Sequence, residues 1–402
     1  MQRYAWVILF LLVVAQFVMS MGSFSYGPLA PFLRDTLNIS RGQVGTLVSL
    51  FYFTATLAAI PAGLLVDQIG ARPMLILCLL LEGMPYALQA LAENFLTLAL
   101  FSGLSGFGYG FINQVSTKGI VTWFPPGLRA TAMGIKQAGV TFGGAAAALL
   151  LPLISVNYSW QMAVFTIGLL MFCMVAFAFL FYRERPEGSL TSPRTPTDKE
   201  GMTLKEALSQ PTLLILMVVV PFLAFSHGSS VSFLVLYLKE QVRMPVEMAG
   251  RCMTASMVAA TLGRVVWGLV SDRVFREDRI KPIIIISSVG ALSTLGIALL
   301  TPLSSHLLAY IFSALQGFSL SGWNALVMVL AAELGGAKLA ASVVSVVITV
   351  VGIGFLVGPI VFGYVADHLG YFTSWMGVFA ASLISIVGFT YLEFLHRKEK
   401  SP

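Results

Sequence analysis

Apolar residues in this chain gather in long runs that short polar stretches interrupt. Twelve of these runs reach the roughly 17–25 residues that a helix needs to cross a bilayer. We expect membrane-spanning helices near residues 5–33, 43–65, 73–92, 95–120, 129–151, 160–182, 212–238, 247–270, 282–301, 306–331, 340–365 and 374–395. The pattern predicts an all-α membrane protein with twelve transmembrane helices.

The longest connection separates the sixth run from the seventh. It contains RERPEGSLTSPRTPTDKEG, which is rich in charge, Pro, Ser and Thr and is typical of a flexible linker. We therefore expect an N-terminal six-helix bundle over residues 1–182, a cytoplasmic linker over 183–211 and a C-terminal six-helix bundle over 212–402.

Composition supports lipid as the solvent of this chain. It is 57% hydrophobic and 10% charged, whereas a soluble domain carries about 25% charged residues. The net charge of +6 is scattered over short loops, so no nucleic acid partner is expected. The three cysteines show neither metal spacing nor a disulfide framework. We expect no metal, no cofactor and a monomer in the bilayer.

The basic residues predict the orientation. With both termini in the cytoplasm, sixteen of the 24 Lys and Arg residues fall on the inner side and five on the outer side, as the positive-inside rule requires. The other three, Lys118, Lys136 and Arg264, lie in or near the apolar core. We expect a multi-pass plasma membrane protein of a bacterial inner membrane.

The two halves resemble each other. FSGLSGFGYGFIN (101–113) aligns without gaps on FSALQGFSLSGWN (312–324), GLLVD (63–67) aligns on GLVSD (268–272), and MGSFSYG (21–27) aligns more weakly on HGSSVSF (227–233). The offsets of 211, 205 and 206 residues are nearly constant. Two pseudo-symmetric bundles in the same order indicate the parallel duplication of a transporter.

GLLVDQIGAR (63–72) resembles the loop motif of the major facilitator superfamily, although Gln68 stands where that motif has Arg. A degenerate second copy begins at Gly268, and Phe275 replaces its later glycine. The resemblance implies two bundles that rock around a central cavity by alternating access. It also implies a cytoplasmic gate, in which the glycine allows close helix packing and the acid faces a helix dipole. The residues that it assigns to this gate are Gly63, Asp67, Gly70, Arg72, Arg129, Gly268, Asp272 and Arg273.

A finer resemblance concerns bacterial monocarboxylate and oxalate/formate carriers of organic anions. GIGFLVGPIVFGYVADHLGYFTSW (352–375), AAELGGAK (331–338) and GRVVWGLVSDR (263–273) are similar to segments of that group, in which the arginine of the last segment binds the substrate carboxylate. The eleventh helix lacks the lysine of oxalate carriers, since Val347, Ile348 and Thr349 occupy that region.

Arg264 lies about 9 Å inside the cytoplasmic end of its helix, because six residues rise 1.5 Å each. An arginine at this depth faces protein or a water-filled cavity. It either clamps an anionic substrate or pairs with a helix end or an acid. The repeat-related position is Ala59, so the charge is not part of the duplicated scaffold, which favours the first interpretation.

Other polar residues within the spans are open to two interpretations each. Lys136 is a second cationic contact for an anion, or a structural lysine whose stem reaches the cytoplasm. His227, beside the helix-loosening Gly228-Ser229-Ser230, relays protons or packs. Glu82 carries a proton or has a structural partner. Candidate cavity residues are Tyr26, Tyr52, Asn113 and Asn324, although the paired asparagines could equally tie helices together.

The core cations lead us to expect a secondary transporter of a small organic anion, a carboxylate, coupled to protons or working by exchange. The alternative is a proton-coupled efflux pump for hydrophobic drugs, which needs an aromatic cavity and a membrane acid. An enzyme would need a convergent catalytic set at one membrane face. We find no His-rich metal motif, nucleophile elbow or phosphate loop, so we expect no enzyme.

Overall fold

The computed structural model describes residues 2–184, 209–275 and 278–400, and the regular secondary structure in these ranges is helical. Twelve segments within them are long and apolar enough to cross a membrane, which confirms the predicted fold class. They are Tyr4–Leu37, Arg41–Ala59, Ala71–Leu91, Phe95–Trp123, Gly127–Asn157, Trp160–Phe181, Pro211–Glu240, Val246–Arg273, Ile280–Ala298, His306–Gly335, Val343–His368 and Gly370–Leu395.

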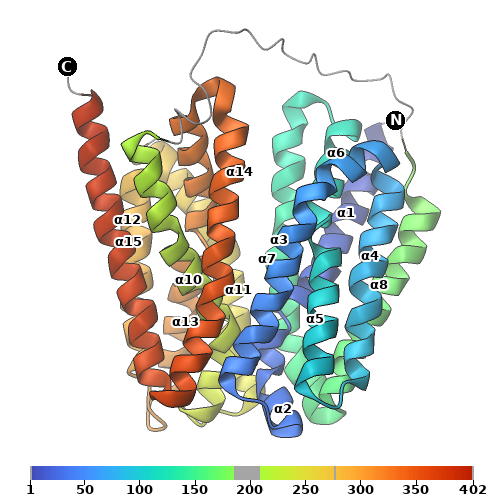
Figure 1. Ribbon diagram of the computed structural model, residues 1–402, viewed down its shortest axis with the longest axis vertical. Coiled ribbons are helices and arrows are strands. Elements are labelled where there is room, and N and C mark those ends of the chain that lie inside the picture. The colour runs from blue at the N-terminus through green and yellow to red at the C-terminus, as the bar shows by residue number, and fades with distance from the viewer. Residues whose placement is uncertain (1, 185–208, 276–277, 401–402) are drawn as a thin grey trace. The chain divides into compact units, whose positions relative to one another are not determined.

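The chain divides into two compact units (Figure 1). The first comprises Met1–Ile39 and Thr46–Thr195. Its helices are α1 (Gln2–Ser23), α2 (Tyr26–Leu37), α3 (Arg41–Ile69) from Thr46 onward, α4 (Ala71–Leu88), η1 (Gln89–Leu91), α5 (Phe95–Tyr109), α6 (Ile112–Trp123), α7 (Pro126–Asn157) and α8 (Trp160–Phe181).

The second unit comprises Ser40–Gly45 and Pro196–Pro402. Its helices are α10 (Pro211–Glu240), α11 (Val246–Arg273), α12 (Ile280–Ala298), α13 (His306–Leu320), α14 (Trp323–His368) and α15 (Gly370–Lys400). Helix α14 contains both the end of the tenth span and the whole eleventh span. Most of the predicted linker, residues 185–208, lies outside the described residues.

Polar side chains in the short connections fix where several helices begin. The side chain of Asn94 accepts the amide of Thr97 at 3.0 Å before α5, and Ser159 accepts the amide of Met162 at 3.2 Å before α8. Such caps satisfy amides that have no partner within the first helical turn. Helix α2 ends at Asn38, whose left-handed φ of 51° suits an asparagine.

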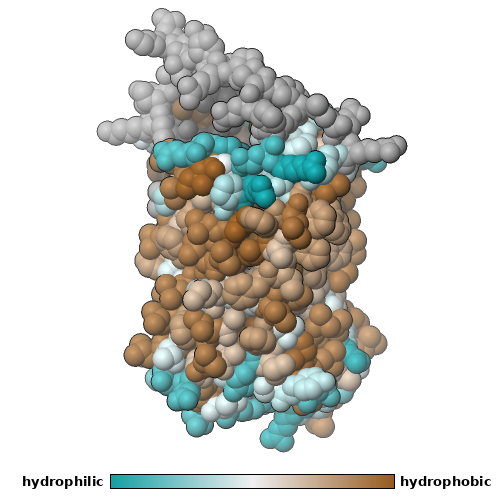
Figure 2. Space-filling view, turned by 90° about the vertical axis from the view of Figure 1, so that its right-hand side faces the viewer, coloured by the Kyte–Doolittle hydropathy of each residue, from teal (hydrophilic) through white to brown (hydrophobic). Residues whose placement is uncertain are grey.

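Large apolar side chains cover the outside of the helices. Phe10 of α1, Phe142 of α7 and Val387 of α15 are 66%, 50% and 69% exposed. The face in Figure 2 shows apolar residues in a band between two hydrophilic ends. Water would disfavour such a surface, whereas lipid tails match it, so this band is the part that the hydrocarbon core covers.

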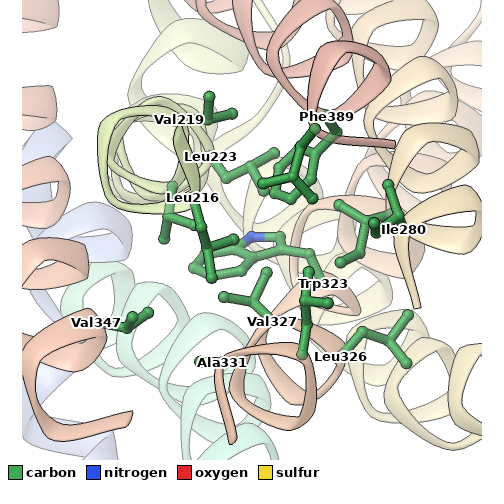
Figure 3. Close-up of a cluster of buried hydrophobic side chains, with 14 of the residues drawn as sticks. Leu216, Val219, Leu223, Ile280, Trp323, Leu326, Val327, Ala331, Val347 and Phe389 are labelled. Atoms are coloured by element: carbon green, nitrogen blue, oxygen red, sulfur yellow. The ribbon is translucent and has the colours of Figure 1, made fainter. Parts of the chain in front are cut away.

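The core of the second unit surrounds Trp323, the first residue of α14 (Figure 3). This side chain is fully buried with Leu216 of α10, Ile280 of α12 and Phe389 of α15. Between helices in lipid, such close packing supplies much of the association energy. Trp323 therefore anchors the start of α14.

The fourth and tenth spans are both broken, and at equivalent positions. Gly110 and Phe111 separate α5 from α6, and Ser321 and Gly322 separate α13 from α14, an offset of 211 residues each. The amides of Gly110 and Ser321 each donate to the carbonyl four residues earlier, at 3.1 and 3.3 Å. The duplication seen in the sequence thus extends to the backbone hydrogen bonds of these breaks.

Close helix contacts are repeated in the same way. A Cβ on Gly106 of α5 would lie 2.1 Å from the carbonyl oxygen of Phe51 in α3. One on the equivalent Gly317 of α13 would lie 2.0 Å from that of Ser256 in α11. The missing side chains let these helix pairs approach closely, as small residues do in membrane interfaces.

The expected loosening of the seventh span at Gly228-Ser229-Ser230 is wrong, because α10 continues through it. The hydroxyl of Ser230 donates to the carbonyl of Ser226, and that of Ser232 donates to Gly228, both at 2.7 Å. These serines bond back to their own helix instead of competing with it. Phe355 of α14 packs against Gly228 from outside.

Candidate functional site

The polar centre of the second unit is the break of the tenth span. His227 of α10 is hydrogen-bonded through Nε2 to the hydroxyl of Ser321, at 2.9 Å. Arg264 of α11 points its Nε toward the carbonyl oxygen of the same serine, at 3.4 Å. Two side chains that are far apart in sequence therefore converge on one backbone break.

A small pocket lies beside this break and is lined partly by polar residues. Ser230 of α10, Ser256 of α11 and Gln316 of α13 contribute to its wall together with His227 and Ser321. The Nδ1 atom of His227 is buried and has no hydrogen-bond partner in the described ranges. The wall of this pocket therefore offers both hydrogen-bond donors and acceptors among apolar residues.

Lys136 of α7 occupies a comparable place in the first unit. Its side chain is 3% exposed, and its Nζ donates to Oδ1 of Asn113 at 2.6 Å. Asn113 is exposed and follows the break of the fourth span directly, as the second residue of α6. A cation thus lies at the break of the fourth span, Lys136 in the first unit, and another at the break of the tenth span, Arg264 in the second.

The other predicted cavity residues lie elsewhere. Tyr26 is buried in the first unit, where its hydroxyl and the amide of Gln89 are hydrogen-bonded. Tyr52 of α3 is partly exposed and packs edge-on against Phe51. Asn324 is partly exposed and stands second in α14, as Asn113 does in α6.

The first loop motif is tied to α6. Asp67 lies at the end of α3, and its carboxylate is 3.2 Å from Nζ of Lys118, which also donates to the carbonyl of Val66 at 2.8 Å. The side chain of Asp67 is 77% exposed. The close helix contact expected at Gly63 is not made by the described residues of this unit, since a Cβ there would meet nothing within 4 Å.

Glu184 was not predicted as a site residue, yet it contacts Arg72 and lies beside Gly70 in this motif. Its carboxylate accepts the amide of Arg72 at 3.1 Å. Gly70 has a φ of +97°, and a Cβ on it would lie 2.2 Å from Glu184 Oε1. The guanidinium of Arg72 donates to the carbonyl of Phe179 at 2.5 Å and lies over that ring. The separation of 112 residues between the partners hides this contact from motif analysis.

Arg129 caps the end of α6. Its Nε donates to the carbonyl of Phe124, and a terminal nitrogen donates to the carbonyl of Val121, both at 3.0 Å. A positive charge is favourable at a helix C-terminus, where carbonyls lack partners.

The second motif copy forms a different network. Arg279 binds the carboxylate of Asp272 and, at 3.1 Å, that of Glu333 in α14. Arg273 is exposed at the end of α11, and a Cβ on Gly268 would meet nothing within 4 Å in the described residues. Arg279, which the motif does not contain, takes the central role here.

Asp278 orders the start of α12 next to this network. Its carboxylate accepts the amides of Ile280 and Lys281 at 3.0 and 3.2 Å, and Lys281 Nζ lies 2.8 Å away. Partial burial disfavours the charged form, but the contacts with Lys281 and Ile280 outweigh it and lower the pKa of Asp278 below its usual value. In the described part of the chain, no three His, Cys, Asp or Glu side chains gather as a metal site would require.

Comparison with known proteins gives the following relatives. The family model described as Major Facilitator Superfamily matches residues 12–359. The chain is 25% identical over 265 residues to the hexuronate transporter of Bacillus subtilis (strain 168), covering 63% of this chain and 61% of that protein. It is 24% identical over 357 residues to the probable sulfoacetate transporter SauU of Cupriavidus necator, covering 85% and 82%.

Solved structures share the fold. One is described as a bacterial homolog to the human lysosomal transporter Spinster, in an inward-facing and occupied conformation. It superposes with a TM-score of 0.80 at 18% identity, over 98% of this chain and 97% of that one.

Proposed function

Because the chain belongs to the Major Facilitator Superfamily and is therefore a multi-pass secondary transporter, we propose that its substrate is a small organic anion bearing a carboxylate. We place it in a bacterial inner membrane with both termini in the cytoplasm. The likeness to monocarboxylate and oxalate/formate carriers stays a prediction within this proposal.

The observation that carries the proposal is the arrangement at the break of the tenth span. Arg264 and His227 converge on Ser321 beside a pocket that is lined partly by polar residues. A guanidinium stays charged and offers five donors in a planar fork that matches the geometry of a carboxylate. Lys136 at the break of the fourth span adds a second positive charge. Cations within the apolar spans favour a negatively charged substrate.

The names of the relatives support the same class. Hexuronate and sulfoacetate are both organic anions, and the two proteins named for them are 25% and 24% identical to this chain. The proposal also includes the residues of the two loop motifs. We assign Asp67, Arg72 and Arg129 in the first unit, and Asp272 and Arg273 in the second, to a cytoplasmic gate that closes during alternating access. Gly70 gives this gate its positive-φ turn, and Gly63 and Gly268 leave room for a neighbouring helix to approach.

Uptake into proteoliposomes tests the substrate class. Radiolabelled galacturonate serves as the anion, and galactose serves as its neutral counterpart. We expect uptake of the acid and not of the sugar. Losing one charge-assisted hydrogen bond costs about 1.5–3 kcal/mol, so R264Q should raise the concentration for half-maximal uptake, or lower the rate, by about 10- to 150-fold.

The matched control is R251Q, which removes a positive charge from the same helix at an exposed position. It should transport as the wild type does. R264K, which keeps the charge but not the fork, should fall between the two. If a panel of organic acids including galacturonate is neither bound nor moved, and R264Q leaves the binding of every transported compound unchanged, the proposal fails. Resistance to hydrophobic drugs would then favour an efflux pump.

A further inference from the structure

Glu82 is a carboxyl group in the interior of the first unit. It lies in α4 and its side chain is fully buried. Its Oε1 atom is 2.9 Å from the place where a Cβ on Gly22 of α1 would stand, and its backbone nitrogen is 2.3 Å from the equivalent point on Gly108 of α5. Two glycines thus leave the space in which this residue sits.

Neither carboxyl oxygen of Glu82 has a hydrogen-bond partner in the part of the chain that the structure describes. Among the described residues, the titratable groups that lie within electrostatic range of it are Cys78 and Tyr86 of α4, Tyr26 of α2 and Tyr52 of α3. Cysteine thiols and tyrosine hydroxyls carry no positive charge, so none of these groups can neutralise a carboxylate at Glu82. From α1 and α8, the nearby residues are a glycine and a methionine, which do not titrate.

An ionised carboxylate without a cation or donors is very costly in such a place. Moving an isolated carboxylate into a dry interior costs several kcal/mol even after relaxation, and binding a proton removes the charge. A protonated side chain avoids this cost.

Glu82 also lies next to the break of the first span. Residues 24–25 separate α1 from α2, and Tyr86, one turn after Glu82 on the same helix, donates its hydroxyl hydrogen bond to Ser25 in this break. Ser25 in turn donates to the carbonyl of Gly22 at 2.7 Å, the residue that Glu82 Oε1 approaches. The carboxyl group and the break thus share their neighbours.

We propose that Glu82 is the proton-binding site of this transporter and that it releases its proton to water when the first span rearranges at residues 24–25. The ligand is a single proton, bound to one carboxyl oxygen and lost as the carboxylate gains hydration. This inference rests on the proposed function for its place in the transport cycle, because it selects proton coupling over pure exchange.

The test uses E82Q, which has the shape of the protonated side chain and cannot release a proton. In infrared spectra of the protein in liposomes, the wild type should show the C=O stretching band of a buried protonated carboxyl group, and E82Q should lack that component. In transport, E82Q should lose accumulation of the anion driven by a pH gradient and retain exchange of labelled for unlabelled anion. E93Q, at an exposed glutamate after the same helix, should keep both the band and the accumulation.

Three results would overturn the proposal: a band that is unchanged in E82Q, accumulation in E82Q equal to that in wild type, or the absence of pH-driven accumulation in a wild type that exchanges the anion. A wild type that moves no organic anion at all would instead refute the proposed function. In that case the infrared comparison alone decides whether Glu82 holds a proton.

Discussion

Replacing Gly317 by alanine adds one methyl group where α13 meets α11. The new Cβ would lie 2.0 Å from the carbonyl oxygen of Ser256, whereas ordinary contacts of a Cβ begin at 3.4 Å. The two helices must therefore separate by about 1.4 Å, the difference between these distances. The hydrogen bond from Trp267 Nε1 to the carbonyl of Phe318, now 3.1 Å long, joins the same two helices and would be lost.

These effects set the size of the loss. Overpacking costs about 1–3 kcal/mol and a lost hydrogen bond about 0.5–1.5 kcal/mol. We expect G317A to lower the free energy of unfolding by about 1.5–4.5 kcal/mol in total. It should also weaken anion transport, because Ser321 would move away from Arg264.

Unfolding by sodium dodecyl sulfate in mixed micelles, followed by circular dichroism and tryptophan fluorescence, measures this loss. G377A in α15 is the matched control, since a Cβ at that exposed position would meet nothing within 4 Å, and it should be neutral or stabilise by up to about 1 kcal/mol. The equivalent G106A should repeat the loss in the first unit. If G317A unfolds together with the control, close helix contact at this glycine does not stabilise the protein.

Three further changes test other contacts. G70A should lower the free energy of unfolding by about 1–3 kcal/mol, because φ +97° and ψ 163° suit only glycine and the methyl group would meet Glu184; a thermal melt equal to wild type would contradict this. D278A should lower the melting temperature at neutral pH. Because the folded-state pKa of Asp278 is depressed, the difference in melting temperature between wild type and D278A should shrink as the pH falls through that pKa, where the wild type also loses its bond to Lys281. A difference in melting temperature that does not change with pH would contradict this role of Asp278. K136Q should reduce anion transport by about 10- to 150-fold with no loss of thermal stability, whereas equal transport would make the lysine structural.

The spans were predictable because the length and apolarity of a membrane helix are imposed by the bilayer. The duplication was also visible, since FSGLSGFGYGFIN and FSALQGFSLSGWN are identical at six of thirteen positions, including Gly106 and Gly317, and Asn113 and Asn324. The breaks at Gly110 and Ser321 were not predicted, because hydropathy does not distinguish a continuous helix from one that two residues interrupt. At Gly228 the opposite error arose, since serine hydroxyls that bond within their own helix look the same in sequence as those that weaken it.

The sequence predicted part of the candidate site. A charge in an apolar run is a strong indication of a functional residue, and Arg264 and Lys136 are two such charges. Their contacts with Ser321 and Asn113 depend on which helices pack together, which the sequence does not state. Glu184 and Arg279 lie in polar segments at helix ends, where a charge is ordinary, so only the folded structure shows their contacts with Arg72 and Glu333.

The repeated break also bears on how such a protein can acquire a new substrate. After duplication, the same turn of backbone existed twice, so one copy could change its side chains while the other preserved the architecture. Serine stands at the break in one half and glycine in the other, and the cations beside them come from helices that are not repeat partners. Mutational drift in this protein can therefore alter chemistry in one half at a time without requiring a compensating change in the fold.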